Sequence, residues 1–303
     1  MNSKKLQHFN FNFKAMGSPC QIQLFAADSN AARTIAELAL NDLQRLEQKY
    51  SRYREDSLLS DINRVADKGG RITLDAETAG LIDYANACYL QSDGLFDISS
   101  GILRKAWRFE QSRLPEPKMI TSLLKRIGWD KVNWSPPDLI FSSSGMELDF
   151  GGIVKEYAAD RVVTLCRQAG GRHGLVNLGG DVKIIGPRPD GYPWRVGIAH
   201  PRNRQALLKS LTLHQGAIAS SGDYERCIVI DGKRYSHVLN PKTGWPVQHM
   251  TSVTVVSDHC VIAGSASTIA MLKSEEGPDW LEKLGLPYLW TDVLGRQGGS
   301  LLM

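Results

Sequence analysis

Apolar and polar positions alternate with clear periods in the first part of the chain. Residues 20–26 alternate between the two kinds, which predicts a strand because successive strand side chains point to opposite faces. Beyond Asp28 or Ser29, either of which can cap a helix, apolar residues recur every three or four positions. This spacing predicts a helix that reaches about Tyr50 and buries one stripe of side chains, made of Ile35, Ala39, Leu43, Leu46 and Tyr50.

The same spacing predicts further helices, and glycines mark the ends of several of them. They run from near Asp75 to before Gly94, over residues 118–127, from after Gly151-Gly152 to Gly170, over residues 260–273 and over residues 279–284. The first of these is expected to carry Ala79, Ile82, Asn86 and Tyr89 along one face.

The C-terminal half is dominated by short apolar runs typical of strands. Asp231-Gly232 lies between two such runs and indicates a hairpin turn. Grouped strands, rather than strict alternation with helices, favour an α+β fold over a doubly wound sheet. No break in composition divides the chain, so a single domain over residues 1–303 is expected. The candidate strands are residues 175–178, 182–185, 194–199, 210–214, 228–230 and 252–256.

Composition narrows the class of protein. Of 303 residues, 42% are hydrophobic and 22% are charged, as in ordinary globular proteins. The net charge of +4 gives no reason to expect a nucleic-acid partner. No window approaches the roughly 18 uninterrupted apolar residues of a membrane span, and no apolar stretch follows the basic N-terminus as in a signal peptide. A cytoplasmic location is therefore expected, unless a signal has been removed.

Five cysteines are widely spaced and include no C-x-x-C pair. An odd number without such a pair favours free or buried thiols over a disulfide framework or a zinc site. They are Cys20, Cys88, Cys166, Cys227 and Cys260.

Residues 147–160, Glu-Leu-Asp-Phe-Gly-Gly-Ile-Val-Lys-Glu-Tyr-Ala-Ala-Asp, are the most informative segment for function. They predict a short strand that ends in Asp149, then a glycine pair, then the first turn of a helix. Such a turn lets a ligand approach the backbone and offers helical N–H groups to an anion such as a pyrophosphate. A purely structural turn explains this segment equally well on its own. Lys155 lies where the helix dipole disfavours a cation, so it is either solvated or paired with an anionic partner.

Other unusual segments accompany this one. With residues 147–160, in this order and at these separations, they resemble the FAD:protein FMN transferase (ApbE-type) family, from about residue 13 to about residue 272. The resemblance implies the ApbE-like α+β fold, FAD as substrate and Mg²⁺ as cofactor. The segments are Ala15-Met16-Gly17-Ser18, Gly94-Leu95-Phe96-Asp97, Asn177-Leu178-Gly179-Gly180-Asp181, residues 219–226 and residues 235–246.

The resemblance also assigns positions to a flavin site. Asp149 matches a carboxylate of that site, and Met16 and Tyr53 match flavin contacts, although core packing explains either of these two almost as well. Residues 177–181 and 220–223 also have a simpler interpretation as turns. The residues expected to bind FAD are Met16, Tyr53, Gly94, Leu95, Phe96, Asp149, Lys155 and Val238.

His237 is the candidate catalytic residue. It lies in a segment dense in proline and glycine, which holds a loop in one shape. The histidine that it matches in the family is a plausible general base for a hydroxyl nucleophile, and imidazole has a suitable pKa near 7.

The metal site departs from the family pattern. The resemblance implies a main-chain oxygen ligand at Gly152 and oxygen ligands at Ser267 and Thr268. The usual Asp of the family's A-D-A-x-A-T segment is Gly264 here, which should weaken magnesium binding. Gly264→Asp is therefore expected to tighten it. Glu156 replaces a usual glycine, and the sequence leaves the direction of its side chain open.

The expected activity is magnesium-dependent transfer of FMN from FAD to a threonine hydroxyl of an acceptor flavoprotein, with release of AMP. Two alternatives stay open from the sequence. One is hydrolysis of FAD to FMN and AMP. The other is non-catalytic FAD binding, which the glycine at position 264 makes credible.

Overall fold

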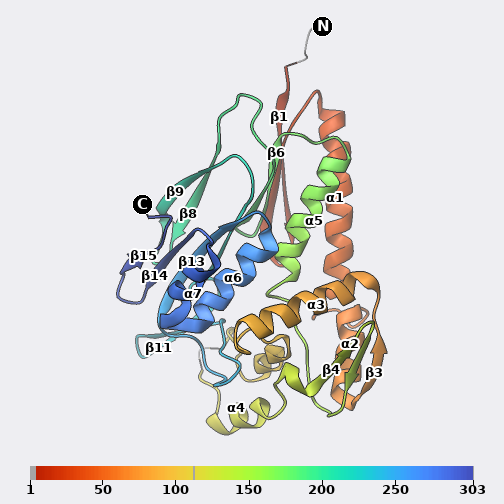
Figure 1. Ribbon diagram of the computed structural model, residues 1–303, viewed down its shortest axis with the longest axis vertical. Helices are drawn as coiled ribbons and strands as arrows, with labels where there is room; N and C mark the ends of the chain where they lie inside the picture. Colours follow the sequence, from red (N-terminus) through yellow and green to blue (C-terminus); the bar gives the residue numbers. More distant parts are fainter. Residues whose placement is uncertain (1–4, 112, 303) are drawn as a thin grey trace.

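An eight-stranded sheet forms the centre of the computed structural model, which describes residues 5–111 and 113–302 (Figure 1). Every pair of neighbouring strands in this sheet is antiparallel. With its helices it makes an α+β fold, as predicted. In sheet order the strands are β1 (Gln7–Ala15), β2 (Ser18–Ala26), β6 (Gly174–Leu178), β7 (Asp181–Gly186), β10 (Ala217–Gly222), β13 (Met250–Ser257), β14 (Tyr288–Asp292) and β15 (Gln297–Gly298).

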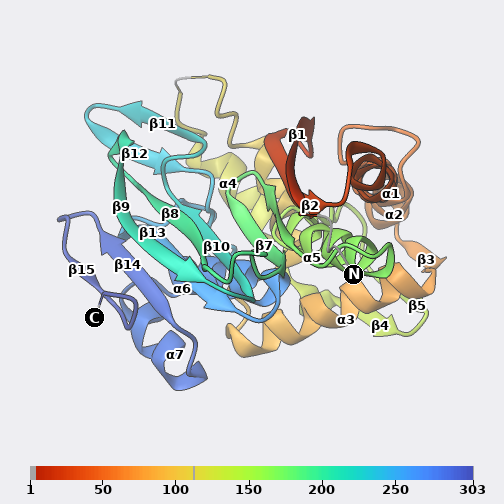
Figure 2. The same cartoon turned by 90° about the horizontal axis from the view of Figure 1, so that it is seen from above.

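Three helices cover one face of this sheet. The helix α1 (Ser29–Tyr50) packs on β1 and β2, α5 (Val154–Gln168) on β6 and β7, and α6 (Cys260–Lys273) on β10 and β13. Figures 1 and 2 show α1 and α5 side by side. The predicted stripe of α1 is buried throughout, and Asp28 caps the helix by accepting the Ala31 N–H (2.9 Å). These helices therefore match the three-to-four spacing of their apolar residues.

The hairpin of β8 (Trp194–His200) and β9 (Asn203–Leu213) covers the other face. Its Trp194 and Ile198 share a buried cluster with side chains of β6, β7, β10 and β14. Coverage of both faces explains why β6 and β7 are almost continuously buried.

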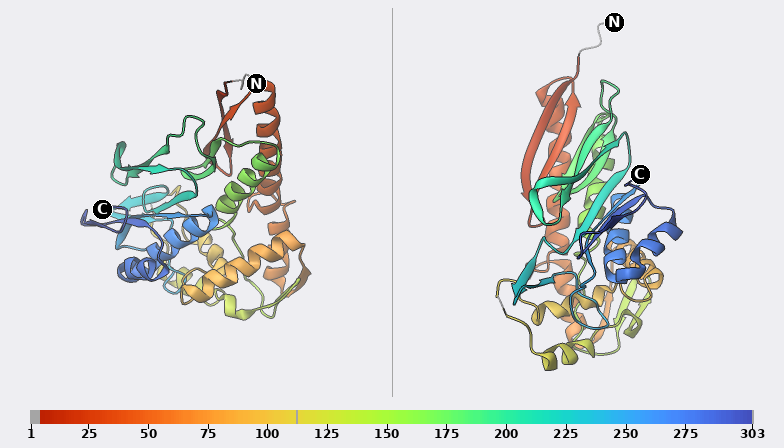
Figure 3. Two further views of the ribbon diagram at one scale, coloured as in Figure 1. Left: turned by 45° about the horizontal axis from the view of Figure 1, so that its top comes forward. Right: turned by 90° about the vertical axis from the view of Figure 1, so that its left-hand side faces the viewer.

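Below the sheet lies a second group of elements (Figure 3). The hairpin of β11 (Cys227–Ile230) and β12 (Lys233–Ser236) packs on its 3₁₀-helix η1 and on α4. The group consists of α2 (Leu58–Lys68), α3 (Ala76–Gln91), η1 (Ile98–Lys105), α4 (Pro117–Leu124), η2 (Trp129–Lys131) and the small sheet β3 (Gly70–Thr73), β5 (Asp138–Phe141) and β4 (Val132–Ser135). The chain also forms η3 (Ser274–Glu276) and α7 (Gly277–Leu284) beside α6.

Several local predictions were wrong. Residues 147–149 form no strand, and residues 220–222 belong to β10 rather than to a turn. The helix predicted over residues 118–127 ends at Leu124, and β9 begins at Asn203. In α3 the buried face is rotated from the predicted one and consists of Thr78, Leu81, Ile82, Ala85 and Cys88.

Two predictions from composition concern the cysteines and the possibility of a membrane-spanning helix. All five cysteines are free, and only Cys227 is not fully buried. In the residues that the structure describes, no helix has both the length and the apolar character needed to cross a bilayer.

Candidate functional site

The turn before α5 fixes Asp149. The Asp149 backbone N–H donates to the Ile98 carbonyl (2.8 Å), and its carboxylate accepts the Gly151 N–H (2.8 Å) and pairs with Arg52. A Cβ at Gly101 would lie only 2.5 Å from the Asp149 Cβ. The helix η1 can therefore pack this closely against Asp149 only because residue 101 is glycine. The Asp149 carboxylate is therefore held from two sides, by the chain turn and by Arg52.

Tyr53 lies between two arginines. Arg52 donates to the Tyr53 hydroxyl (2.9 Å), and its guanidinium carbon lies 5.0 Å from the ring centroid. Desolvation raises the pKa of Tyr53, but Arg52 and Arg226 together outweigh it, and the net pKa is lowered. The Tyr53 residue is 76% exposed, which excludes core packing as its role. Its ring is available to a ligand.

Met16 occupies the tight turn between β1 and β2. Ala15 pairs with Ser18, so Met16 and Gly17 form a two-residue hairpin loop, and both have positive φ (49° and 75°). Glu47 accepts the Met16 N–H (2.9 Å), and the Met16 side chain packs partly against the main core. A Cβ on Gly17 would lie 3.7 Å from the Arg226 guanidinium, so this turn lies close to Arg226.

His237 follows β12 and is solvent-accessible. Its Nδ1 lies 3.3 Å from the Arg226 carbonyl oxygen, which can only accept, so Nδ1 carries the proton and Nε2 is the basic nitrogen. Partial desolvation by surrounding protein atoms lowers the pKa of His237, and the nearby charges of Arg226 and Arg52 lower it further. The imidazole is therefore neutral at pH 7 and able to accept a proton.

The loop after His237 is fixed by its own hydrogen bonds. Asn240 donates its N–H to the Trp245 carbonyl (2.9 Å) and accepts the Gly244 N–H on its own carbonyl (2.7 Å). The indole of Trp107, on the segment after η1, donates to the Gly244 carbonyl (2.8 Å). These hydrogen bonds are consistent with a loop held in one shape.

Residues 94–96 pack near Val238 and Gly152. Leu95 and Val238 both pack, partly buried, against the apolar cluster around α6 and β13. Phe96 is buried, and its ring lies 3.2 Å from where a Cβ on Gly152 would be. Gly94 has φ of 77°, a conformation that favours glycine.

Lys155 has partners within the protein. It forms ion pairs with Asp181 and with Glu156 Oε1 (3.1 Å). Asp181 also accepts the Ser220 N–H of β10 (3.2 Å). The ion pairs balance the Lys155 charge in the free protein, so it is not simply solvated, and its contact with FAD stays a prediction.

Two other family segments have structural roles. Asn177 accepts the Gly180 N–H (2.8 Å) across a tight turn in which Gly179 and Gly180 have positive φ, which confirms the turn interpretation. Asp223 is buried and forms a two-point ion pair with Arg202 (2.6 and 2.7 Å).

Hydroxyl groups gather at the predicted metal ligands of α6. The Ser221 hydroxyl lies 2.9 Å from that of Thr268 and 2.8 Å from that of Ser267. Ser267 is fully buried and donates to the Gly264 carbonyl (2.9 Å), whereas Thr268 is partly exposed. Thr268 is therefore the better placed of the two to bind an ion, and Ser267 as a direct ligand stays a prediction.

The side chain of Glu156 lies against Gly264. A Cβ on Gly264 would be 2.4 Å from Glu156 Cγ, so no side chain fits at position 264 unless Glu156 or a helix moves. The substitution Gly264→Asp therefore requires Glu156 to move, which works against the expectation that this substitution alone tightens metal binding.

The residues present fit a hard cation. Among residues 5–111 and 113–302, no three His, Cys, Asp or Glu side chains form a metal-binding cluster. Glu156 Oε2, however, is buried without any hydrogen-bond partner in this part of the chain. A lone buried carboxylate oxygen suits a magnesium ion, which is commonly held by one or two carboxylates plus substrate phosphates.

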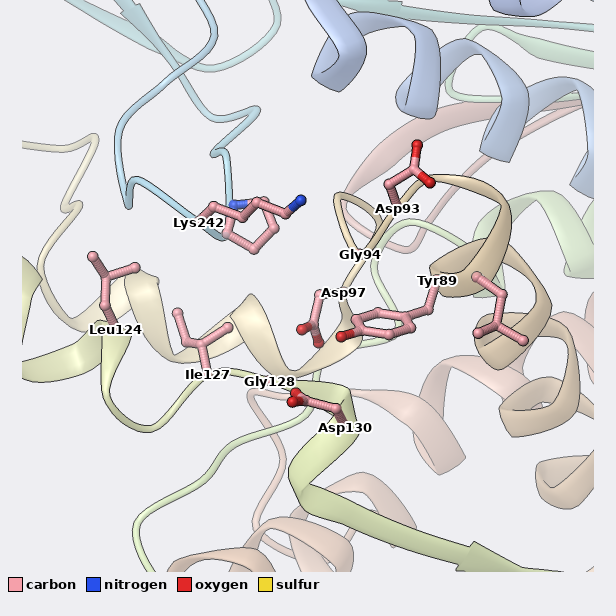
Figure 4. Close-up of a pocket in the computed structure, with 11 residues that line it drawn as sticks. Tyr89, Asp93, Gly94, Asp97, Leu124, Ile127, Gly128, Asp130 and Lys242 are labelled. Carbon is pink, nitrogen blue, oxygen red and sulfur yellow. The ribbon is translucent and has the colours of Figure 1, made fainter.

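A cavity of about 460 Å³ adjoins these residues (Figure 4). Gly94 lines it, together with the end of α3 and the loop at Pro241-Lys242, whereas Asp149 and His237 do not. Figure 4 shows Tyr89 close to the carboxylates of Asp97 and Asp130. Three aspartates and one lysine line the cavity, and this surplus of negative charge does not suit a pyrophosphate.

Sequence reasoning missed several residues of the site. Arg52 lies immediately before Tyr53, and Arg226 ends the segment 219–226, but neither was assigned a role. A cation beside two matched positions is a signal that could have identified both. The role of Asp160 was also missed. It accepts the Cys260 and Val261 N–H groups (2.9 and 3.0 Å) and so caps α6.

The sequence matches known proteins over most of its length. The model of the ApbE family matches residues 16–290. The FAD:protein FMN transferase of Klebsiella pneumoniae is 33% identical over 258 residues, which cover 82% of this chain and 77% of the relative. That of Haemophilus influenzae is 26% identical over 289 residues, covering 90% of this chain and 83% of the relative.

Solved structures have the same fold. An ApbE protein from Thermotoga maritima superposes with a TM-score of 0.88 at 33% identity and covers 97% of both chains. The flavinyl transferase ApbE from Pseudomonas stutzeri, in its apo form, has a TM-score of 0.87 at 27% identity, covering 99% of this chain and 96% of that chain. The chain therefore belongs to the ApbE family of flavin transferases.

Proposed function

We propose that this protein transfers FMN from FAD to a threonine hydroxyl of an acceptor protein and releases AMP, with Mg²⁺ as its cofactor. The observation that carries the proposal is the state of His237, whose Nε2 is free and whose pKa is lowered beside Arg226. The relatives that match most of the chain are named for the transfer of FMN from FAD to a protein.

In the proposed reaction His237 acts as the general base. Its Nε2 takes the proton of the threonine hydroxyl while the hydroxyl oxygen attacks the phosphorus of the FMN moiety. The bond from this phosphorus to the bridging oxygen breaks, and AMP leaves with that oxygen. A phosphate ester of threonine remains on the acceptor.

The arginines and Asp149 position the dinucleotide in this proposal. Arg52 and Arg226 lie beside Tyr53 and carry positive charge suited to phosphate oxygens. Asp149, fixed by the turn before α5, offers a carboxylate to hydrogen-bond donors of the flavin ring.

The Gly152 carbonyl and the Thr268 hydroxyl are the proposed protein ligands of the magnesium ion, with Ser267 as a further candidate. When bound, Mg²⁺ would neutralise the charge that develops on the phosphate oxygens. Ser221 would orient the Thr268 hydroxyl through their 2.9 Å contact.

Mass spectrometry tests the transfer directly. The protein is incubated with FAD, Mg²⁺ and candidate acceptor proteins, and each acceptor is examined for an added FMN group. An acceptor with its threonine replaced by alanine is the matched control. FMN on the intact acceptor alone is the expected result. Free FMN and AMP with no modified acceptor would indicate hydrolysis instead, and unchanged FAD would indicate a binding protein.

A further inference from the structure

Glu156 and Gly264 form a reciprocal pair at the contact between α5 and α6. A Cβ on Gly264 would lie 2.4 Å from Cγ, 3.0 Å from Cδ and 3.3 Å from Oε1 of Glu156. The carboxylate of Glu156 thus occupies the space that a side chain at position 264 would enter. In the resembled family the carboxylate comes from position 264 and the glycine stands at position 156.

The two helices meet in a regular antiparallel register. Asp160 of α5 binds the first N–H groups of α6 at Cys260, and one turn earlier on α5 Glu156 faces Gly264, one turn later on α6. Each step is four residues, which returns to the same helix face. Gly152 lies in the turn just before α5, and Thr268 lies one further turn along α6. Figure 1 shows α5 and α6 as neighbours.

The carboxylate of Glu156 lacks a partner for one oxygen. Glu156 is 8% exposed, and Lys155 pairs with its Oε1 (3.1 Å), whereas Oε2 is buried without a hydrogen bond to any described residue. An unpaired buried carboxylate oxygen costs free energy unless a ligand binds it.

Charges around Glu156 also favour a cation. Lys155 pairs with both Glu156 and Asp181, and Lys183 lies 3.6 Å from Asp160. Three carboxylates and two ammonium groups leave a net charge of −1 in this cluster. Because the net charge of this cluster is negative, it attracts a cation and not a phosphate.

We infer that Glu156 supplies the carboxylate ligand of the magnesium ion, in place of an aspartate at position 264. Gly264 leaves the room for it, Gly152 lies in the turn before α5, and Thr268 lies one helical turn after Gly264 on α6. The inference rests on the proposed function, because that function requires a divalent cation beside the FAD pyrophosphate.

Direct metal titration tests the inference. Mn²⁺ is titrated into each variant, with and without FAD, and free Mn²⁺ is followed by its electron paramagnetic resonance signal. Glu156→Gln keeps the side-chain shape but removes the charge, and we expect it to weaken binding by roughly tenfold or more. Asp138→Asn, which removes a carboxylate paired with Arg71 in the small sheet, is the matched control and should bind Mn²⁺ as the wild type does.

A swap of the two positions gives the sharper result. Gly264→Asp alone should not tighten binding, because its side chain collides with Glu156. The double variant E156G/G264D should recover most of the affinity that E156G loses. Thermal unfolding of each variant shows whether it is folded. Wild-type affinity in folded E156Q, or no recovery in the folded double variant, would overturn the inference.

The assay separates this inference from the proposed function. If the wild type binds Mn²⁺ through Glu156 but modifies no acceptor, the proposed function fails and the ligand assignment stands. If E156Q keeps both full Mn²⁺ affinity and full transfer, the assignment fails and the function stands.

Discussion

At the residue scale, the chemistry of the site depends on how His237 is oriented and charged. The Arg226 carbonyl accepts from Nδ1, and this leaves Nε2 for the nucleophile. Desolvation and the charges of Arg226 and Arg52 disfavour the imidazolium and outweigh the hydrogen bond to the Arg226 carbonyl and the charge of Asp223, so the net pKa is lowered. The same arginines lie where a pyrophosphate would need positive charge.

Replacement of His237 by alanine tests its role as a base. We expect the single-turnover rate of FMN transfer to fall by roughly 10²–10⁴-fold, while FAD affinity stays near the wild-type value. An unchanged transfer rate would remove His237 from the chemistry.

The pH profile of the wild type should report the same group. Because the pKa of His237 is lowered, the neutral base persists below the ordinary imidazole pKa of about 6.5. The rate is therefore expected to stay level from pH 7 to about that value and to fall only in more acidic solution. A fall that begins above the ordinary pKa would contradict the predicted shift. The profile of His237→Ala should lack this inflection.

Asp149→Ala tests the flavin contact. The substitution removes a charged hydrogen-bond acceptor and leaves Arg52 without its partner, so FAD should bind roughly tenfold more weakly. Asp138→Ala is the matched control, because Asp138 also pairs with an arginine, Arg71, and its side chain is similarly exposed (17% against 18%). Fluorescence titration of FAD measures both, and equal affinities would remove Asp149 from the site.

At the element scale, a charged network ties three helices together. Glu77 of α3 accepts from Arg45 (2.7 Å) and Lys49 (2.9 Å) of α1 and from the Tyr157 hydroxyl of α5 (3.0 Å). The hydrogen bonds from Arg45 chiefly lower the pKa of Glu77, to about 2, against the opposing effect of burial. Since α5 carries Glu156 and begins at the site turn, this network also sets the position of the site.

Glu77→Gln should destabilise the fold in a pH-dependent way. The folded pKa is depressed, so the stabilisation is present above the unfolded pKa of about 4.3 and is lost as pH falls toward 2. Partial exposure limits the loss to about 1 kcal/mol at pH 7. Urea unfolding at several pH values measures it, with Asp56→Asn in an exposed pair as control. A deficit that stays constant down to pH 3 would contradict the prediction.

Periodicity predicted the long elements and failed on the short ones. The stripe of α1 was clear because tertiary burial follows its spacing, whereas α6 is buried on most sides and is recognised by the length of its apolar run. The alternation of Phe9, Phe11 and Phe13 with polar residues signals β1 but was overlooked. The small residues at 220–222 leave a turn open as an alternative in the sequence, but they belong to β10. They are small because β10 lies between β7 and β13 under α6.

For the candidate site, local sequence motifs were informative, whereas contacts between distant segments could not be predicted. Motif order located Asp149 and His237, because these residues stand in segments with unusual glycines and prolines. It could not predict that Glu156 faces Gly264, since that contact depends on how α5 and α6 pack. Nor could it predict the Arg52–Asp149 pair, whose members are far apart in sequence.

At the scale of the whole molecule, the site forms where two groups of elements meet. Asp149 stands against η1 of the lower group, whereas Thr268 belongs to α6 on the sheet. His237 follows the β11–β12 hairpin, which packs on η1 and α4. A ligand that touches all of these residues connects the two groups and should stabilise the fold.

FAD and Mg²⁺ should therefore stabilise the protein cooperatively. Magnesium alone meets one buried carboxylate and few other ligands, so its effect on the melting temperature should be small. FAD adds phosphate oxygens for the ion, and a ligand at about 100 times its Kd contributes roughly 2.7 kcal/mol to the free energy of unfolding. Because linkage is reciprocal, the shift with both ligands should exceed the sum of the separate shifts.

Thermal unfolding with each ligand and with both measures this excess. Riboflavin is the matched control, because it presents the flavin ring without the pyrophosphate. If the excess arises from phosphate oxygens that share the ion with Glu156, it should vanish with riboflavin and shrink in E156Q. An excess of the same size with riboflavin would mean that the ion and the dinucleotide do not meet through the phosphates, and shifts that merely add would mean that they bind apart.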